Sequence, residues 1–183
     1  MGKYKHGKPN QEINVEDLQQ AIEKGHFTDP LRHKSYLAIL YWIGCRRAEP
    51  FEVKKEDVKQ EGESLFINIP AFKGGKRGGL IELALSLYGV NLIKDTWEKT
   101  KPNKPLWNFS SKTGYRIIKR IWPTRTPHWL RHNRITKIRK KIDGKTFSLD
   151  DAKSFTGIKS DRTMQTYGMK TQEGIHRVAQ VLE

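Results

Sequence analysis

Five side chains with complementary chemistry occur in order along this 183-residue chain: Arg46, Lys73, His128, Arg131 and Tyr167. The planar guanidinium groups of two arginines can bind the non-bridging oxygens of one phosphate, and they stay charged. A lysine can protonate a leaving oxygen, and a histidine can accept a tyrosine proton. A tyrosine can attack phosphorus and form a covalent phosphoester. This set of residues is therefore sufficient to cleave a phosphodiester without a metal ion.

Other kinds of site have weaker support in the sequence. Neither a GxxxxGK[ST] nor a GxGxxG pattern occurs, which argues against a nucleotide site. His128 and His132 share a spacing of four but lack the glutamate of an HExxH pattern and an evident third ligand. Asp150-Asp151 and Glu52-Val53-Lys54 are weak matches to a metal nuclease. We predict no metal and no cofactor.

The net charge of +15 predicts an anionic partner. Residues 101–145 contain 14 basic residues and one acidic residue, which leaves only +2 for the rest of the chain. Positive charge concentrated near tryptophans is typical of a nucleic-acid surface, although a solvated cationic face would give the same composition. The single cysteine, Cys45, excludes an internal disulfide and is typical of a reducing compartment.

The motifs around these residues resemble those of the tyrosine recombinase (phage integrase) family, specifically of its catalytic domain. Residues 44–50 read GCRRAEP, similar to the family's G-L-R-x-S-E-L box. Residues 128–132 match H-x-L-R-H in full, and residues 163–167 match T-x-Q-x-Y. Lys73 occupies the place of the hairpin lysine in K-[TG]-x-K. The order of the boxes holds across residues 11–183.

The resemblance implies a site-specific DNA recombinase, the integrase of a virus or mobile element. Tyr167 would attack the scissile phosphate and form a 3′-phosphotyrosine, while Arg46 and Arg131 clamp that phosphate. Lys73 would protonate the leaving 5′-oxygen, and His128 would assist the transfer of the tyrosine proton. Glu49 would be an accessory residue that orients an arginine.

Two features depart from the family pattern. Ile158 stands nine residues before Tyr167, where the family has a histidine or tryptophan that donates a hydrogen bond to the phosphate. Isoleucine cannot donate, so we expect weak activity unless the neighbouring Lys159 takes over. In addition, residues 1–10 are predicted to be a flexible basic tail, too short to supply the DNA-clamping domain that precedes the catalytic domain in full-length relatives.

Three alternatives to a recombinase remain open. A type IB topoisomerase-like enzyme would use the same chemistry to rejoin the same strand. A catalytically silent DNA-binding module of this fold is favoured by Ile158. A metal-dependent nuclease would require divalent ions and would leave no protein–DNA adduct.

Hydrophobic periodicity predicts the elements that position these residues. Helices are expected from Asn14 to Gly25, after Asp29-Pro30 to Gly44, and over 46–51, 85–100, 110–122, 128–142, 148–155, 160–167 and 173–182. Residues 64–83 are expected to form two strands joined by a turn at 73–76, and Pro70 indicates an edge strand. The fold class is therefore mixed and mainly α, with a small antiparallel sheet that we expect to have about three strands.

The expected partner is double-stranded DNA, and the expected location is the cytoplasm, acting on host or viral DNA. The helix over 173–183 is expected to mediate self-association on DNA, and no membrane role is expected. The basic residues expected to contact DNA are Lys76, Arg77, Arg116, Lys119, Arg120, Arg134 and Lys137.

Overall fold

The computed structural model of the chain describes residues 12–70, 79–143 and 148–150, and only the backbone of residues 141–143. Its elements, in chain order, are α1 (Val15–Lys24), α2 (Pro30–Ile43), the 3-10 turns η1 (Glu49–Glu52) and η2 (Lys55–Asp57), β1 (Val58–Glu61), β2 (Ser64–Ile69), β3 (Gly79–Ala84), α3 (Val90–Lys99), α4 (Ser111–Ile121) and α5 (Pro127–Asp143). The expected mixed, mainly helical class is confirmed.

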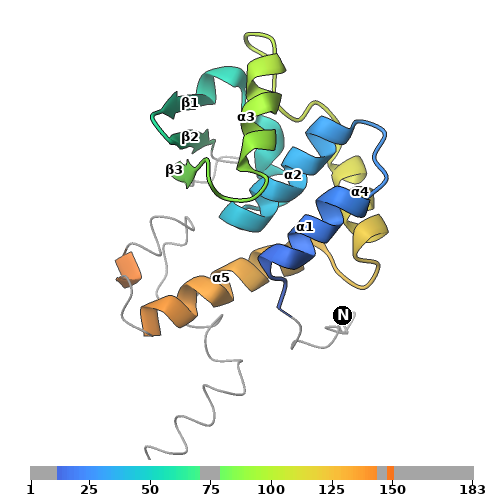
Figure 1. Ribbon diagram of the computed structural model, residues 1–183, viewed down its shortest axis with the longest axis vertical. Coiled ribbons are helices and arrows are strands. Elements are labelled where there is room, and N and C mark those ends of the chain that lie inside the picture. The colour runs from blue at the N-terminus through green and yellow to red at the C-terminus, as the bar shows by residue number, and fades with distance from the viewer. Residues whose placement is uncertain (1–11, 71–78, 144–147, 151–183) are drawn as a thin grey trace, which may run out of the picture.

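Helix α2 is the central element, and it contacts α1, α3, α4 and α5. Figure 1 shows the sheet on one side of α2 and α4 on the other. The helix begins at Pro30, after the N-cap Asp29, whose side chain accepts the Arg32 N–H at 3.2 Å. From Ser35 to Ile43 every residue is buried, which explains why its sequence is apolar on all sides.

The sheet is antiparallel with the strand order β1-β2-β3. Ile67 of β2 lies opposite Val58 of β1 and Ile81 of β3, and all three side chains are buried. The expectation of an edge strand at Pro70 is wrong, because β2 is the central strand. The strand ends at Ile69, one residue before Pro70, so the missing N–H of that proline interrupts no ladder.

Two expected helices have different bounds in the structure. The helix expected from Leu85 begins instead at Val90, after Gly89 in a left-handed conformation with φ of 81°. The short helix expected over 46–51 is the 3-10 turn η1, which ends where the Val53 N–H bonds to the Pro50 carbonyl. The other expected helices up to residue 142 are confirmed. Those over 160–167 and 173–182 lie outside the described residues, as do the hairpin turn at 73–76 and most of 148–155.

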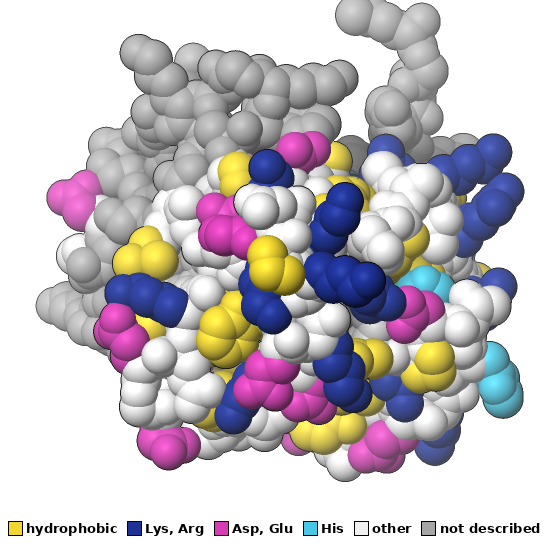
Figure 2. Space-filling model, turned by 90° about the horizontal axis from the view of Figure 1, so that it is seen from above, with side chains coloured by type: hydrophobic (Ala, Val, Ile, Leu, Met, Phe, Trp, Pro, Cys, Tyr) yellow, Lys and Arg dark blue, Asp and Glu magenta, His cyan; other side chains and the backbone are white. Residues whose placement is uncertain are grey.

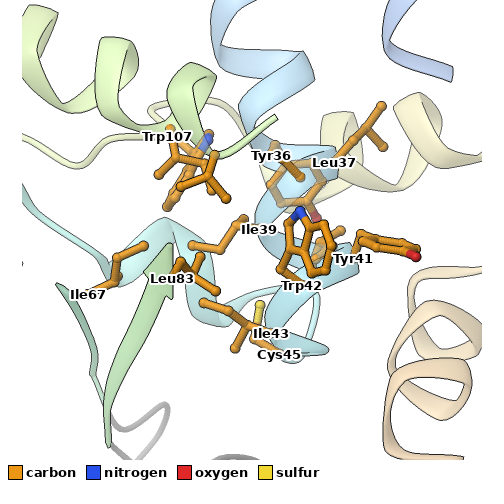
Figure 3. Close-up of a cluster of buried hydrophobic side chains, with 14 of the residues drawn as sticks. Tyr36, Leu37, Ile39, Tyr41, Trp42, Ile43, Cys45, Ile67, Leu83 and Trp107 are labelled. Atoms are coloured by element: carbon orange, nitrogen blue, oxygen red, sulfur yellow. The ribbon is translucent and has the colours of Figure 1, made fainter. Parts of the chain in front are cut away.

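The core joins α2 to the sheet and to the segment between α3 and α4, as Figure 3 shows for Ile39, Leu83 and Trp107. Trp107 is fully buried, and its indole N–H donates to Ser35 Oγ at 3.0 Å. The Thr96 hydroxyl lies 2.9 Å from the same oxygen. These buried polar contacts fix α3 and the 106–107 segment against α2, because an unpaired polar group in the core costs free energy.

No helix among the described residues is both long enough and apolar enough to span a lipid bilayer.

Candidate functional site

The first predicted box forms a turn at the carboxyl end of α2. Gly44 caps the helix with φ of 65°, and its N–H donates to the Leu40 carbonyl at 3.0 Å. This left-handed conformation is readily adopted by glycine and disfavoured for other residues. The chain then reverses through the buried Cys45 into Arg46. We call residues 44–46 the Gly44–Arg46 turn.

Glu49 holds Arg46 from within the protein. Its carboxylate accepts the backbone N–H of Arg46 at 2.6 Å and lies 3.7 Å from the Arg46 guanidinium. The Glu49 side chain is 10% exposed, whereas that of Arg46 is 48% exposed. A buried carboxylate that fixes both the backbone and the head group of an exposed arginine limits the positions that this arginine can take.

Arg131, on α5, reaches the same turn. Its side chain is buried, and Nη1 donates to the Gly44 carbonyl oxygen at 2.7 Å. Burial raises the pKa of the Cys45 thiol far above its ordinary value, and Glu49 raises it further while Arg131 lowers it. Cys45 thus lies within electrostatic reach of both residues. The Arg131 guanidinium therefore binds a carbonyl that lies two residues before Arg46 in the sequence.

His128 lies in the first turn of α5, three residues before Arg131, and its side chain is exposed. The start of this helix is fixed by Thr126, whose carbonyl accepts the N–H groups of Trp129 and Leu130 at 3.0 and 3.2 Å. Residues three apart share a helix face, and the amino end of a helix favours a bound anion. The position of His128 is compatible with its predicted role next to a phosphate.

The candidate DNA contacts on α4 differ in the partners of their head groups. Arg116 is exposed. The Lys119 ammonium donates to the Pro123 carbonyl at 2.8 Å, and Arg120 Nη1 donates to the His26 carbonyl at 3.2 Å. Lys119 and Arg120 thus each donate a hydrogen bond to a main-chain carbonyl, and Arg116 differs from them in this respect.

The two candidates on α5, Arg134 and Lys137, pack against the interior of the chain. The Arg134 guanidinium lies 5.7 Å from the ring centroid of Trp42. The Lys137 ammonium donates to the Ile13 carbonyl and lies 5.5 Å from the ring centroid of Tyr41. Burial lowers the pKa of both side chains. The sequence could not reveal these partners, because they lie some 90 to 125 positions away along the chain.

Arg47 is one of the basic residues that were assigned no role from the sequence. Arg47 is exposed, and its guanidinium lies 5.7 Å from the ring centroid of Tyr115 on α4. Its carbonyl accepts the Tyr36 hydroxyl at 3.1 Å, which ties the segment after the Gly44–Arg46 turn to the core. The adjacent basic pair of Arg46 and Arg47 was the only signal in the sequence, and it did not distinguish their environments.

The other predicted site residues, namely Lys73, Lys76, Arg77, Ile158, Lys159 and Tyr167, lie outside the described residues. Within the described ranges, no group of three or more His, Cys, Asp or Glu side chains could hold a metal ion.

The face drawn in Figure 2 carries charges of both signs. Lysine and arginine side chains are interspersed there with aspartate and glutamate side chains. Among the residues coloured on that face, the positive charge therefore does not form an unbroken field.

Solved structures with a similar fold include recombinases and an integrase. The XerH recombinase bound to palindromic difH substrate, in a post-cleavage complex, matches 99% of this chain and 56% of its own with 18% identity and a TM-score of 0.69. The XerA recombinase matches 97% of this chain and 67% of its own, with 17% identity and a TM-score of 0.68. For a lambda integrase (75–356) dimer bound to a COC′ core site, the coverages are 89% and 60%, the identity 16% and the TM-score 0.57.

No protein-family model matches the sequence, and no curated protein sequence does either. The chain spans a little over half the length of the XerH chain that it matches. At these identities the likeness establishes the architecture, and it agrees with the motifs read from the sequence. The chain has the fold of the tyrosine recombinase catalytic domain.

Proposed function

We propose that this chain is the catalytic part of a site-specific DNA recombinase, the integrase of a virus or mobile element, with residues 11–183 forming the catalytic domain. The observation that carries the proposal is the hydrogen bond from Arg131 to Gly44, which joins two of the predicted phosphate-binding elements. The likeness in fold to recombinases solved with DNA supports it.

In the proposed reaction, the Tyr167 oxygen attacks the scissile phosphorus and its bond to the 5′-oxygen breaks. The products are a 3′-phosphotyrosine and a free 5′-hydroxyl. His128 assists removal of the phenol proton, and Lys73 donates a proton to the departing oxygen. Attack by a 5′-hydroxyl on the phosphotyrosine reverses the step and rejoins DNA. The step needs no metal ion and no nucleotide.

Arg46 and Arg131 have different environments suited to binding one phosphate. The Arg46 guanidinium is partly exposed and lies next to Glu49, so it is accessible to a DNA phosphate that approaches from solvent. Arg131 is buried, and its Nη1 donates a hydrogen bond to the Gly44 carbonyl. The other N–H groups of the guanidinium can bind an anion. Such fixed charges stabilise the negative charge that develops in a pentacoordinate transition state.

Contacts outside the reacting phosphate are proposed from charge and exposure. Arg116 is the leading candidate on α4, with Lys119 and Arg120 beside it on the same helix and Lys76 and Arg77 in the β2–β3 connection. Phosphate contacts of this kind give affinity without sequence information. Self-association on DNA through residues 173–183 and action on host or viral DNA in the cytoplasm are part of the same proposal.

A nicked suicide duplex, incubated with the intact chain in EDTA and run on a denaturing gel, tests the proposal. We expect a covalent protein–DNA adduct that Tyr167→Phe abolishes. Tyr115→Phe is the matched control, because it removes a phenol oxygen from α4 without touching the predicted nucleophile. An adduct that persists in Tyr167→Phe would contradict the assignment of the nucleophile.

A silent DNA-binding module is the second candidate, and Ile158 favours it because that side chain cannot donate a hydrogen bond to a phosphate. It predicts DNA binding without an adduct at any duplex sequence. Cleavage that leaves no adduct and requires divalent ions would instead indicate a metal-dependent nuclease.

A further inference from the structure

Cations packed on aromatic rings join α5 to the carboxyl end of α2. Arg134 lies over Trp42 and Lys137 over Tyr41, at 5.7 and 5.5 Å from the ring centroids. The two rings are edge to face, with centroids 4.9 Å apart, and Figure 3 shows them side by side at the end of α2. The Trp42 indole N–H donates to the Tyr88 carbonyl at 2.9 Å, which fixes the ring beneath Arg134.

The stem of Arg134 lies against the Gly44–Arg46 turn. A Cβ built on Gly44 would come within 2.8 Å of Arg134 Cβ and 3.0 Å of its Cγ. The main chain of α5 is also close, since the Arg131 carbonyl oxygen would lie 3.7 Å from the Cβ built on Gly44. Gly44 is thus covered by Arg134 on its Cα side, while Arg131 binds its carbonyl oxygen.

A charged side chain is a costly choice for this position if packing is its only purpose. Burial lowers the pKa of Arg134, which shows that the surroundings disfavour the charged form. An apolar side chain of similar length would fill the space without losing hydration. The contact of its guanidinium with Trp42 and the cover that its stem gives Gly44 indicate a role in orientation.

We propose that Arg134 is a positioning residue, which holds the Gly44–Arg46 turn against α5 so that Arg46 keeps its position relative to the Arg131–Gly44 contact. Its stem covers Gly44, and its guanidinium is fixed on Trp42. This assignment differs from the DNA contact expected from the sequence. Its catalytic consequence rests on the proposed recombinase function, whereas its structural consequence does not.

Cys45 provides a reporter of this turn that is independent of DNA cleavage. It is the only cysteine of the chain, it is 3% exposed, and it lies in the middle of the turn. Its thiol can react with an aromatic disulfide reagent only when the turn opens or the chain unfolds. Loss of the Arg134 contact should increase the frequency of local opening.

The test compares Arg134→Met, which keeps an unbranched stem but removes the charge, with Arg134→Lys, which keeps both. Arg116→Met is the matched control, an exposed arginine on α4. For each intact protein, the Cys45 labelling rate is measured together with the free energy of unfolding in denaturant. We expect Arg134→Met to label about tenfold faster than wild type, and Arg134→Lys and Arg116→Met to stay near the wild-type rate.

The DNA arm separates orientation from phosphate contact. In Arg134→Met we expect a slower adduct-forming rate at saturating protein, with an unchanged salt dependence of DNA affinity and rescue by Arg134→Lys. In Arg116→Met, which removes a proposed phosphate contact, we expect the slope of log K against log salt to be reduced by about 0.9. If wild type forms no adduct, the recombinase proposal fails and the Cys45 arm still decides the role of Arg134.

Three results would overturn the assignment. The first is a wild-type Cys45 labelling rate in Arg134→Met. The second is faster labelling that is fully accounted for by a lower free energy of global unfolding, which would make Arg134 an ordinary packing residue. The third is a reduced salt slope in Arg134→Met with unchanged labelling, which would make Arg134 a DNA contact.

Discussion

Arg131 and Gly44 are joined across 87 positions of the chain by a buried hydrogen bond of 2.7 Å from Nη1 to the carbonyl oxygen. The contact attaches α5 to the end of α2, two residues before Arg46. A buried carbonyl requires a partner, and here that partner is a residue predicted to bind phosphate. If the proposed site is correct, substitutions of Arg131 should therefore affect both the stability of the fold and the cleavage of DNA.

Replacing Arg131 separates these two contributions. Arg131→Ala leaves the Gly44 carbonyl without its donor, so the free energy of unfolding should fall by about 1–3 kcal/mol. Arg131→Lys can still donate to that carbonyl and should be more stable than the alanine variant. Both variants should lose most cleavage, because lysine lacks the planar fork that binds two phosphate oxygens. Denaturant unfolding and adduct-forming rates check this, and a fully active Arg131→Lys would contradict it.

Gly44→Ala tests the left-handed turn. A φ of 65° is unfavourable for alanine by about 1–2 kcal/mol, and the added Cβ would meet Arg134 Cβ at 2.8 Å. We expect a lower free energy of unfolding, measured in denaturant, and slower cleavage, measured as the adduct-forming rate. The matched control is Gly62→Ala, which also has a positive φ but no atom within 4 Å of an added Cβ. A loss of stability no larger than that of the control would show that α5 does not pack closely enough against Gly44 to exclude a Cβ.

Glu49→Gln tests the support of Arg46. The glutamine oxygen can still accept the Arg46 N–H, but a neutral acceptor forms a weaker hydrogen bond than a carboxylate does, by about 1 kcal/mol. We expect a small loss of stability and a larger loss of cleavage rate, since the guanidinium of Arg46 also loses its ionic partner at 3.7 Å. Equal cleavage rates for Glu49→Gln and wild type would refute the orienting role.

His33 predicts how stability depends on pH. Its ring is buried edge-on between Phe27 and Phe109, with centroids at 6.1 and 4.9 Å. Burial lowers the pKa of His33, Asp29 raises it and Arg120 lowers it. Because the unfolded chain then binds a proton more readily, stability should be lost as the pH falls from about 6.5 toward the folded pKa.

Melting temperatures of wild type and His33→Gln between pH 8 and 5 measure this effect. The substitution should remove part of the acid-induced decrease, since glutamine does not titrate. Parallel curves for the two proteins would show that other groups cause the decrease.

Local chemistry made several elements predictable. Asn14 forms a capping box with Asp17, Ser110 caps α4 through the Thr113 N–H, and Gly44 ends α2. Each of these signals depends on residues within four positions, so it is visible in the sequence. The motifs likewise predicted that the turn after α2 and the helix after Pro127 belong to one site, and the Arg131–Gly44 contact joins them.

The features that the sequence could not predict depend on tertiary packing. Strand β1 was not expected, because three of its four residues are exposed and polar, and only pairing with β2 identifies it. The basic pattern of α5 predicted DNA contacts for Arg134 and Lys137, but it could not reveal that Trp42, Tyr41 and the Ile13 carbonyl are their neighbours. The roles of all the predicted site residues remain predictions, and Lys73, Lys76, Arg77, Ile158, Lys159 and Tyr167 also lie outside the described residues.

The central claim is that Arg46 and Arg131 bind the same DNA phosphate. A duplex whose scissile phosphate carries a methyl group in place of one non-bridging oxygen tests it most directly, because the neutral linkage needs less cationic stabilisation. On normal DNA, Arg46→Ala and Arg131→Ala should each cleave about 10²–10³-fold more slowly than wild type. On the neutral linkage both deficits should shrink markedly, whereas deficits of unchanged size on both substrates would contradict the account.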